Sequence, residues 1–255
     1  YDLNINYPAT FNAGVELQVY NSVIVTEGTL ALGGNSLTIC TASQSETNEE
    51  CSLYVDQPAS ITQNSDATTL FYGSKASPCI GVSSGVCNGS IGTVTLGDVT
   101  FAAGSAFAIG TSIGGNTVTF DSVDVSNATL VLGNATLNLT GNGTPLVGIQ
   151  FSGVVSVGTS TINYNSAGTS GTTIAELNTP YYNLGMSKAG NTFTAPTSLE
   201  IGKDLTIYAG TFVAPSGILT IYGNLTNDGT FTHNSGTVSI QPVFNNKTST
   251  IGGNN

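Results

Sequence analysis

Alternation of apolar and polar residues runs along most of the chain, and near its C-terminal end it recurs with a fixed period. The segment Lys203–Phe212 (KDLTIYAGTF) returns, one residue shorter, as Gly223–Phe231 (GNLTNDGTF). The segment Gly217–Ile221 returns as Gly236–Ile240, so the period is about 20 residues, which is typical of repeat architectures. Alternation with period two predicts short strands, and a unit of this size is too small to bury a core alone. We therefore expect successive units to stack as turns of a β-solenoid.

Earlier parts of the chain carry the same alternation. Tyr20–Leu32 matches Phe120–Leu132, and Val94–Phe101 aligns with Val118–Val125. These matches predict further turns on both sides of residues 40–90, where the pattern lapses. We interpret residues 40–90 as a cross-linked excursion from the solenoid or a small subdomain. Residues 145–180 alternate but match no repeat, and the tract Asn165–Thr173 within them is expected to be an exposed loop.

The C-terminal repeats resemble the Gly/Thr/Asn-rich repeats of secreted bacterial and archaeal surface proteins. The shared pattern is GTL-x-(V/I)-x-GN(L/F)TN(D/N)GTF, and the resemblance covers about residues 180–240. It implies a right-handed parallel β-helix on the outside of a cell. It implies no reaction.

These observations predict an all-β fold of parallel solenoid turns with a disulfide-stapled insert. We expect an N-terminal strand at residues 1–8, a β-rich domain at 9–145 that contains the insert at 40–90, and a solenoid repeat domain at 146–255. The alternative is a pair of β-sandwich domains, because the offset between Tyr20–Leu32 and Phe120–Leu132 equals the length of one sandwich. The much shorter period of the C-terminal repeats favours the solenoid, since a sandwich does not require it.

The composition excludes several classes of function but does not indicate a particular one. Charged residues make up 7% of the chain, against about 25% in ordinary globular proteins, and there is no arginine. The net charge of −11 argues against nucleic-acid partners, because phosphate neutralisation needs clustered Lys and Arg. No run approaches the roughly 18 apolar residues of a membrane-spanning helix, so no membrane insertion is predicted. No signal peptide is evident and the sequence starts at Tyr1, so we expect a mature, processed protein.

The four cysteines predict disulfides and an oxidising location. They are Cys40, Cys51, Cys79 and Cys87. Three pairings are open, and local spacing favours Cys40–Cys51 and Cys79–Cys87. A zinc site is excluded by the absence of a C-x-x-C motif and by the single histidine, His233. Disulfides of this kind are typical of extracellular proteins.

Sequons for N-linked glycans are the densest motif in the chain. They start at Asn88, Asn127, Asn134, Asn138, Asn142, Asn224 and Asn246. Because the surface carries few charges, attached glycans would supply hydration, and we predict that several of these asparagines are glycosylated. The alternative is that they are turn and ladder residues of the solenoid.

The first seven residues alternate strictly, with Tyr1, Leu3, Ile5 and Tyr7 on one face of a predicted strand that ends at Pro8. This strand could leave its own subunit and complete a sheet in the next one, as in donor-strand complementation. It could instead cap the first turn of its own solenoid. Both interpretations stay open at this point.

Acidic residues give two weaker candidate sites. Asp121 and Asp124, with Asp98 one turn earlier, could act as an acid–base pair in a carbohydrate-active β-helix enzyme. They form no recognised motif, and no arginine is present to hold a uronate. Glu46, Glu49 and Glu50, or Asp98 with Asp121, could bind calcium, but no EF-hand or nonapeptide repeat is present. We predict no catalytic residue, cofactor or resident metal.

The sequence therefore predicts a secreted structural protein of the microbial cell exterior. We expect a glycosylated subunit of an extracellular filament that polymerises with itself, head to tail, through residues 1–7. It is similar to the donor-strand fibre glycoproteins of archaea and bacteria in its terminal strand and composition. The alternatives are a monomeric adhesin or surface-layer module and a carbohydrate-active β-helix enzyme.

Overall fold

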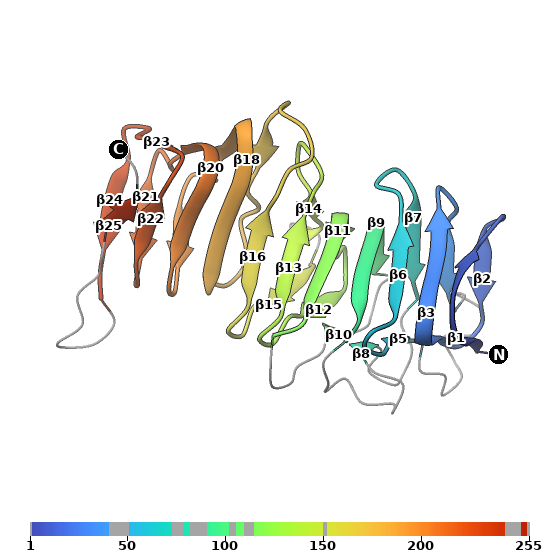
Figure 1. The fold of residues 1–255 in the computed structure, drawn as a ribbon. Coiled ribbons are helices and arrows are strands. Elements are labelled where there is room, and N and C mark those ends of the chain that lie inside the picture. The colour runs from blue at the N-terminus through green and yellow to red at the C-terminus, as the bar shows by residue number, and fades with distance from the viewer. Residues whose placement is uncertain are drawn as a thin grey trace.

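The chain folds into a parallel β-solenoid in the shape of a rod (Figure 1). The computed structural model describes residues 2–40, 51–72, 79–81, 91–101, 106–109, 115–149, 152–242 and 251–253. In these residues the regular structure is β and no α-helix occurs. All pairings between the named strands are parallel. The prediction of a solenoid is confirmed, and two β-sandwiches are excluded because sandwich sheets are antiparallel.

Three rows of parallel strands run along the rod, and we call them rows A, B and C. Row A starts with the first halves of β1 (Leu3–Asn12) and β3 (Val23–Gly33). It continues through β5 (Leu53–Val55), β8 (Cys79–Gly81), β10 (Ala106–Ile109), β12 (Thr129–Val131) and β15 (Val154–Ser156). After an interruption it resumes as β19 (Leu199–Ile201), β21 (Ile218–Ile221) and β24 (Thr237–Ile240).

Row B is continuous from one end of the rod to the other and lies at the front of Figure 1. After the second halves of β1 and β3 it contains β6 (Ser60–Gln63), β9 (Thr93–Phe101), β11 (Thr117–Asp124), β13 (Thr136–Leu139) and β16 (Thr161–Tyr164). It ends with β18 (Asn183–Thr194), β20 (Leu205–Val213), β22 (Leu225–Asn227) and β25 (Ile251–Gly253).

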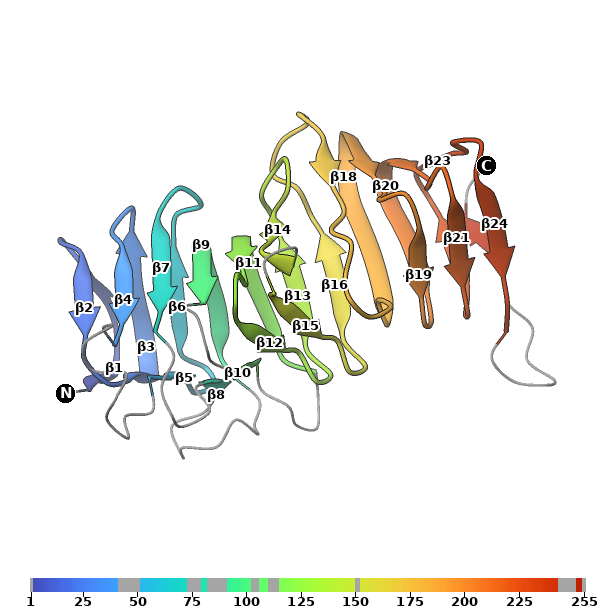
Figure 2. The same ribbon diagram turned by 180° about the vertical axis from the view of Figure 1, so that it is seen from behind.

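Row C is best seen from behind (Figure 2). It consists of β2 (Leu17–Val19), β4 (Leu37–Ile39), β7 (Thr68–Phe71), β14 (Leu146–Val147), β17 (Thr172–Thr173) and β23 (Thr230–Thr232). The second halves of β9, β11, β18 and β20 complete it, because each of these long strands bends from row B into row C.

The predicted repeats correspond to the observed register. Phe212 pairs with Phe231 and Ile221 with Ile240, and Val94 pairs with Val118 in the earlier repeat. The match between Tyr20–Leu32 and Phe120–Leu132 has a different outcome. Val23 lies in row A, whereas its partner in that match, Val123, lies in row C, although both are fully buried. Matched alternation therefore predicts which residues face the core, but it does not predict which row a segment joins.

The described parts of residues 40–90 belong to the solenoid, so the interpretation as an excursion is wrong for them. Strands β5, β6, β7 and β8 each pair with strands of the neighbouring turns. Val23 pairs with Leu53 across a longer stretch of chain than separates the C-terminal repeats, so this turn is long rather than absent.

The predicted disulfide between Cys40 and Cys51 is formed. Cys79 is also disulfide-bonded, and Cys87 lies outside the described residues. Strand pairing continues across residue 145 as well, where β13 pairs with β16.

The core is a set of inward-facing columns along the axis of the rod. Phe71 and Phe101 stack in the column of row C, and Phe107 of row A packs against both, with ring centroids 4.5 to 5.4 Å apart. Such aromatic contacts add about 1 kcal/mol each to the area that they bury. Inward side chains thus contact residues of another row as well as those of neighbouring turns, so the core is continuous along the rod.

A buried ring of hydrogen bonds replaces strand pairing where row A is interrupted. The backbone N–H of Ala175 donates to the hydroxyl of Tyr164 (3.0 Å), which lies 2.9 Å from the hydroxyl of Tyr181. The Tyr181 hydroxyl donates to the carbonyl oxygen of Ala175 (2.7 Å). Both tyrosines are buried, and burial raises the pKa of Tyr164 to about 12 and the pKa of Tyr181 well above its usual value. The ring satisfies both backbone groups of one residue that no strand reaches.

Candidate functional site

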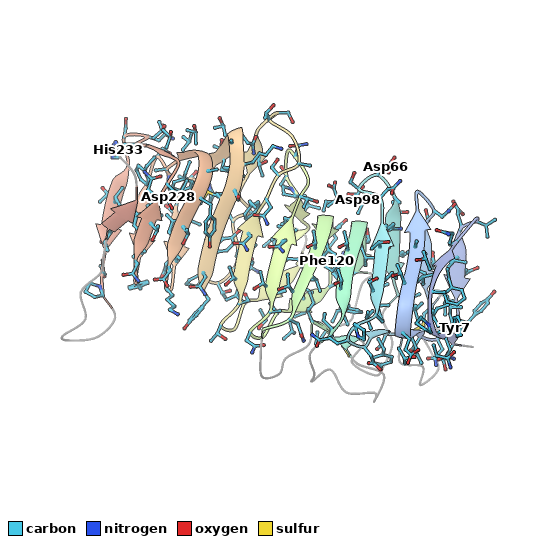
Figure 3. The ribbon with its side chains drawn as sticks, in the orientation of Figure 1. Tyr7, Asp66, Asp98, Phe120, Asp228 and His233 are labelled. Atoms are coloured by element: carbon cyan, nitrogen blue, oxygen red, sulfur yellow. A yellow bond between two sulfur atoms is a disulfide. The ribbon has the colours of Figure 1, made fainter. Side chains whose placement is uncertain are left out.

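The first turn of the solenoid contains the predicted N-terminal strand. Strand β1 pairs with β3 of the same chain, so in this structure it forms the first turn of its own subunit. Leu3 and Ile5 pack toward the core, whereas Tyr7 is 65% exposed and does not share their face. Tyr1 lies outside the described residues. Figure 3 shows Tyr7 at the N-terminal end of the rod, far from His233 at the other end.

The observed strand differs from the predicted one in its length and in the alternation of its faces, and an irregular register explains both differences. The strand does not end at Pro8 but continues to Asn12, and the alternation of its faces is broken after Ile5. The register shifts between Ile5 and Asn6 and again between Asn6 and Thr10, so Tyr7, Pro8 and Ala9 have no partner in β3. Proline is tolerated in such an irregular stretch, because the N–H that it lacks is not needed there.

The first turn also exposes residues that face the core elsewhere. Phe11 is in register with Leu30 of the next turn, yet Phe11 is 39% exposed and Leu30 only 3%. In the described chain no strand pairs with the outer edge of β1 or β2. Four of the eight large exposed apolar side chains of the described residues lie in this turn: Tyr7, Phe11, Val15 and Tyr20. In the described residues, this end of the rod therefore exposes part of the core and has free strand edges.

Among the residues that the structure describes, the opposite end exposes core positions in the same way. Val238 in β24 is in register with Leu219 in β21, but it is 36% exposed where Leu219 is buried. Ile240, in register with the buried Ile221, is half-buried. Both ends thus present inward-facing apolar residues and strands that point in the same direction.

The three predicted acidic residues are held by local hydrogen bonds. The hydroxyl of Ser122 donates to Asp98 (2.5 Å), and the hydroxyl of Thr140 donates to Asp121 (3.2 Å). Partial burial raises the pKa of Asp121, the bond from Thr140 opposes this shift, and the charge of Asp98 adds to it. Asp124 accepts bonds from the backbone N–H and the hydroxyl of Ser126 in its own turn. Asp98 and Asp121 are thus electrostatic neighbours, while Asp124 serves the turn that follows it.

The sequons differ in what their amide groups do. Asn127 is exposed and has a positive φ of 58°, and Asn142 is exposed as well. The amide nitrogen of Asn138 donates to the hydroxyl of Thr119, and the amide nitrogen of Asn224 donates to Asp204. Asn134 is half-buried, with a side-chain oxygen that has no hydrogen-bond partner. Asn88 and Asn246 lie outside the described residues. A glycan on Asn138 or Asn224 would disturb a hydrogen bond that the amide nitrogen donates. A glycan on Asn127 or Asn142 would disturb no such bond.

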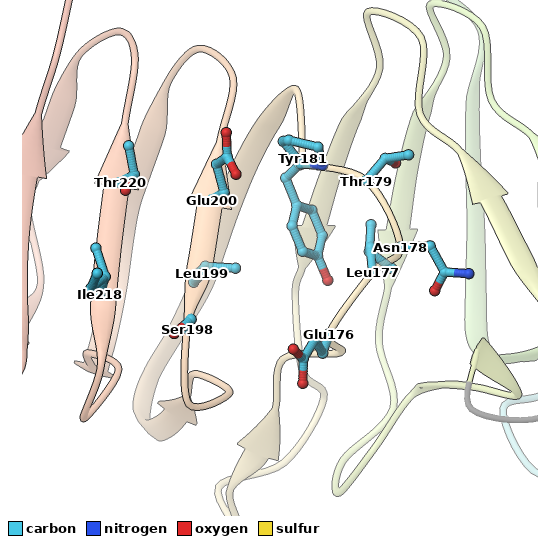
Figure 4. Close-up of a pocket in the computed structure, with 11 residues that line it drawn as sticks. Glu176, Leu177, Asn178, Thr179, Tyr181, Ser198, Leu199, Glu200, Ile218 and Thr220 are labelled. Carbon is cyan, nitrogen blue, oxygen red and sulfur yellow. The ribbon is translucent and has the colours of Figure 1, made fainter.

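A groove of about 380 Å³ lies where row A is interrupted (Figure 4). The segment 175–180 forms no strand there and is tied to the sheet by the Tyr181–Ile201 bridge and by the hydroxyl of Thr179, which donates to the carbonyl of Val155. Polar lining comes from Glu176, Asn178, Thr179, Ser198, Glu200 and Thr220, and apolar lining from Leu177 and Ile218. Figure 4 shows the two carboxylates on different segments, Glu200 on β19 and Glu176 on the irregular stretch.

The chemistry of the groove is that of a hydrogen-bonding surface. No lysine or arginine lines it, so it has no group to neutralise an anion. A hydrogen bond between Glu200 and Tyr222 raises the pKa of Tyr222, and the charge of the carboxylate adds to the shift. Sequence reasoning missed this groove. Its signal is the run Ala175–Pro180, which lacks the alternation on both sides of it.

No metal centre is formed by the residues that the structure describes, since no three His, Cys, Asp or Glu side chains gather into one. The calcium candidates Glu46, Glu49 and Glu50 lie outside the described residues. Among the described residues, no helix has the length and apolar character that crossing a membrane would require. Comparison of the chain with models of protein families, with curated proteins and with solved structures gives no match.

Proposed function

We propose that this protein is a structural subunit of an extracellular filament on a microbial cell, and that copies of it associate end to end. The observation that carries the proposal is the exposure of core positions in the first and last described turns, with Phe11 exposed in one and Val238 in the other. A strand added in the same rows would cover these residues and pair with the free edges.

A second copy of the chain has the geometry for this contact. Each row contains only parallel strands, so the last strands of one copy and the first strands of the next would point in the same direction. Such a contact joins two different surfaces of the subunit. When its rotation does not close a ring, a heterologous contact of this kind produces an open filament.

This proposal changes the way in which the N-terminal strand acts. In the donor-strand hypothesis residues 1–7 leave their own subunit, but β1 pairs with β3 of its own chain. We therefore propose that β1 contributes its free outer edge to the neighbour while it remains in its own first turn.

Several observations support a location outside the cell. The Cys40–Cys51 disulfide is typical of an oxidising compartment. The sequons at Asn127 and Asn142 lie on the surface, where an N-linked glycan can be attached. The C-terminal repeats resemble those of secreted bacterial and archaeal surface proteins, as described above.

Negative-stain microscopy of the purified protein tests the filament. Fibres are expected for the unchanged chain, and they should be lost in Phe11→Glu, which places a charge on the exposed core. Tyr208→Glu is the matched control, because Tyr208 is 54% exposed on β20, which pairs with strands on both sides and lies far from β1. Circular dichroism establishes that each variant is folded.

The possible outcomes test separately whether the protein forms filaments and whether the first turn makes the contact between subunits. If the unchanged chain stays monomeric over a wide range of concentration and salt, the filament proposal is wrong. Fibres that persist in Phe11→Glu would keep the filament but exclude contact through the first turn. A variant without residues 1–7 completes the set, because loss of fibres there and in Phe11→Glu would assign the contact to β1.

A second function, that of an adhesin module, is favoured by the groove at Glu176 and Glu200. Its carboxylates, amides and hydroxyls, next to Leu177 and Ile218, match the hydroxyls and apolar faces of a neutral sugar. Glycan-array binding that is lost in Glu200→Gln, and retained when the exposed Glu27 is changed to Gln, would support it. Absence of binding to any neutral glycan would exclude this function.

A further inference from the structure

The outward surface of row B is a regular array of hydroxyl and amide side chains. In strands β6, β9, β11, β13 and β16, two outward positions in each strand are occupied by polar, uncharged residues. One column contains Ser60, Thr93, Thr117, Thr136 and Thr161, and the other contains Thr62, Thr95, Thr119, Asn138 and Asn163. Figure 1 shows these five strands side by side in one row. We call this surface the threonine face.

The register of the strands places the columns on a two-dimensional lattice. Thr95 pairs with Thr119, Thr119 with Asn138, and Asn138 with Asn163, without a bulge. Neighbouring strands lie about 4.8 Å apart, and residues i and i+2 of one strand lie about 6.6 Å apart. The side chains therefore repeat in two nearly perpendicular directions.

The lattice is also rigid. The residue between the two columns is buried in each strand: Ile61, Val94, Val118, Leu137 and Ile162. Threonine is β-branched, so its χ1 angle is restricted and its hydroxyl and methyl keep fixed directions. The face does not need to become ordered when it meets a ligand, which removes one entropic cost of binding.

Many of the hydroxyls are available to a ligand. Within the described structure, the hydroxyls of Thr93, Thr95 and Thr117 bond to no other protein group. At the edge of the face, Thr93, Thr117 and Thr119 border a hollow of about 510 Å³ whose other lining residues include Gln57, Pro58 and Asn116. Hydroxyls of both columns are thus free to form hydrogen bonds with a ligand.

The other rows lack this regularity. In row C the positions equivalent to one column are Leu70, Thr100 and Asp124, so apolar, polar and charged residues alternate from turn to turn. In row A the outward residues include Ala108, Val131 and Ser156. The array is therefore specific to one face and does not follow from the overall richness in threonine.

We propose that the threonine face binds ice. Crystalline water offers donors and acceptors that repeat in two directions, with spacings of the same order as those between strands and between alternate residues. Hydroxyls and methyls on such a lattice can hold a layer of water that matches the crystal. A charged surface would keep its own hydration shell, and this region contains no Lys, Arg, Asp or Glu in either column.

The ten residues of the threonine face include no charged or aromatic side chain, which argues against other ligands over most of its area. At its border, Thr161 and Asn163 share a hollow with Lys203, Asp204 and the exposed Tyr208. Phosphates need cations, and single sugar chains are usually held against aromatic side chains. The remaining rival is a crystalline polysaccharide, whose surface is also a lattice of hydroxyls. A pelleting assay with insoluble cellulose and chitin distinguishes it from ice.

Thermal hysteresis, the gap between the melting and freezing temperatures of a single ice crystal, tests the proposal directly. The unchanged protein should open this gap and should inhibit recrystallisation of ice. Thr119→Lys places a charge in the centre of the lattice and should remove most of the gap. Thr119→Val, which keeps the shape and loses the hydroxyl, should reduce it less.

Thr100→Lys is the matched control, because Thr100 lies on the same strand as Thr95 but faces outward from row C. It should leave the hysteresis unchanged. Circular dichroism establishes that the variants are folded. An unchanged protein without hysteresis or recrystallisation inhibition overturns the proposal, as does equal loss in Thr119→Lys and Thr100→Lys. Binding to cellulose or chitin without any effect on ice would assign the face to a polysaccharide instead.

Discussion

The buried ring formed by Tyr164, Tyr181 and Ala175 predicts a large effect for the loss of one hydroxyl group. In Tyr181→Phe the carbonyl oxygen of Ala175 loses its hydrogen-bond partner, and the hydroxyl of Tyr164 loses the acceptor for its proton. A buried carbonyl without a partner costs about 1–3 kcal/mol, and the lost bond between the hydroxyls adds about 1 kcal/mol. We therefore expect the free energy of unfolding to fall by about 3 kcal/mol.

Urea unfolding followed by far-UV circular dichroism measures this change, since the chain has no tryptophan to report by fluorescence. Tyr208→Phe removes the same group from a side chain that is 54% exposed, and it should change stability by no more than about 0.5 kcal/mol. The double variant Tyr164→Phe/Tyr181→Phe should show a coupling energy of about 1 kcal/mol or more, because both residues serve Ala175. Equal effects of Tyr181→Phe and Tyr208→Phe would refute the reasoning that the ring replaces strand pairing.

Three further predictions follow from the core and the turns. Stability should fall as the pH rises from about 10 to 12, because the pKa of Tyr164 is about 12 in the folded chain and 10.0 in the unfolded chain, which therefore loses this proton first. The free energy of unfolding, measured with urea across this range, should decline by up to about 1.4 kcal/mol per pH unit for this residue, and by less in Tyr164→Phe. Gly97→Ala should destabilise by about 3 kcal/mol, because a Cβ there would collide with the backbone carbonyls of Ala67 and Asn64, whereas Gly14→Ala, with open space around it, should be neutral in the same urea assay. Removal of the Cys40–Cys51 disulfide by a double alanine substitution should cost about 3 kcal/mol, and an unchanged melting temperature would show that the crosslink does not restrict the unfolded chain.

The sequence predicted the fold and much of the strand register, because residues at equivalent positions of successive repeats pair with one another. The pairs Phe212–Phe231 and Val94–Val118 follow directly from matched segments. The row of a segment did not follow, because inward and outward residues alternate in the same way in all three rows. Tyr20–Leu32 and Phe120–Leu132 therefore look alike and occupy different rows.

Irregular positions were the least predictable parts of the chain. The described strands between residues 51 and 81 were missed because long turns separate them from the previous strands, and a change in turn length conceals a fixed period. The groove at Glu176 arises where alternation stops, and a loop alone does not indicate a pocket. The threonine face had a signal that could have been used, since Thr-Val-Thr begins at both Thr93 and Thr117, at equivalent positions of successive turns.

The three parallel rows have a mechanical consequence for a rod of this kind. Backbone hydrogen bonds between strands run along the axis of the rod, so a pull on its two ends loads them in tension rather than in shear. A turn of about 20 residues that peels away would replace about 4.8 Å of rod by nearly 70 Å of extended chain. Because each turn contacts only its neighbours, turns would detach one at a time and absorb work at each step. The disulfide between Cys40 and Cys51 would stop this extension locally, so the two ends of the rod should yield differently under force.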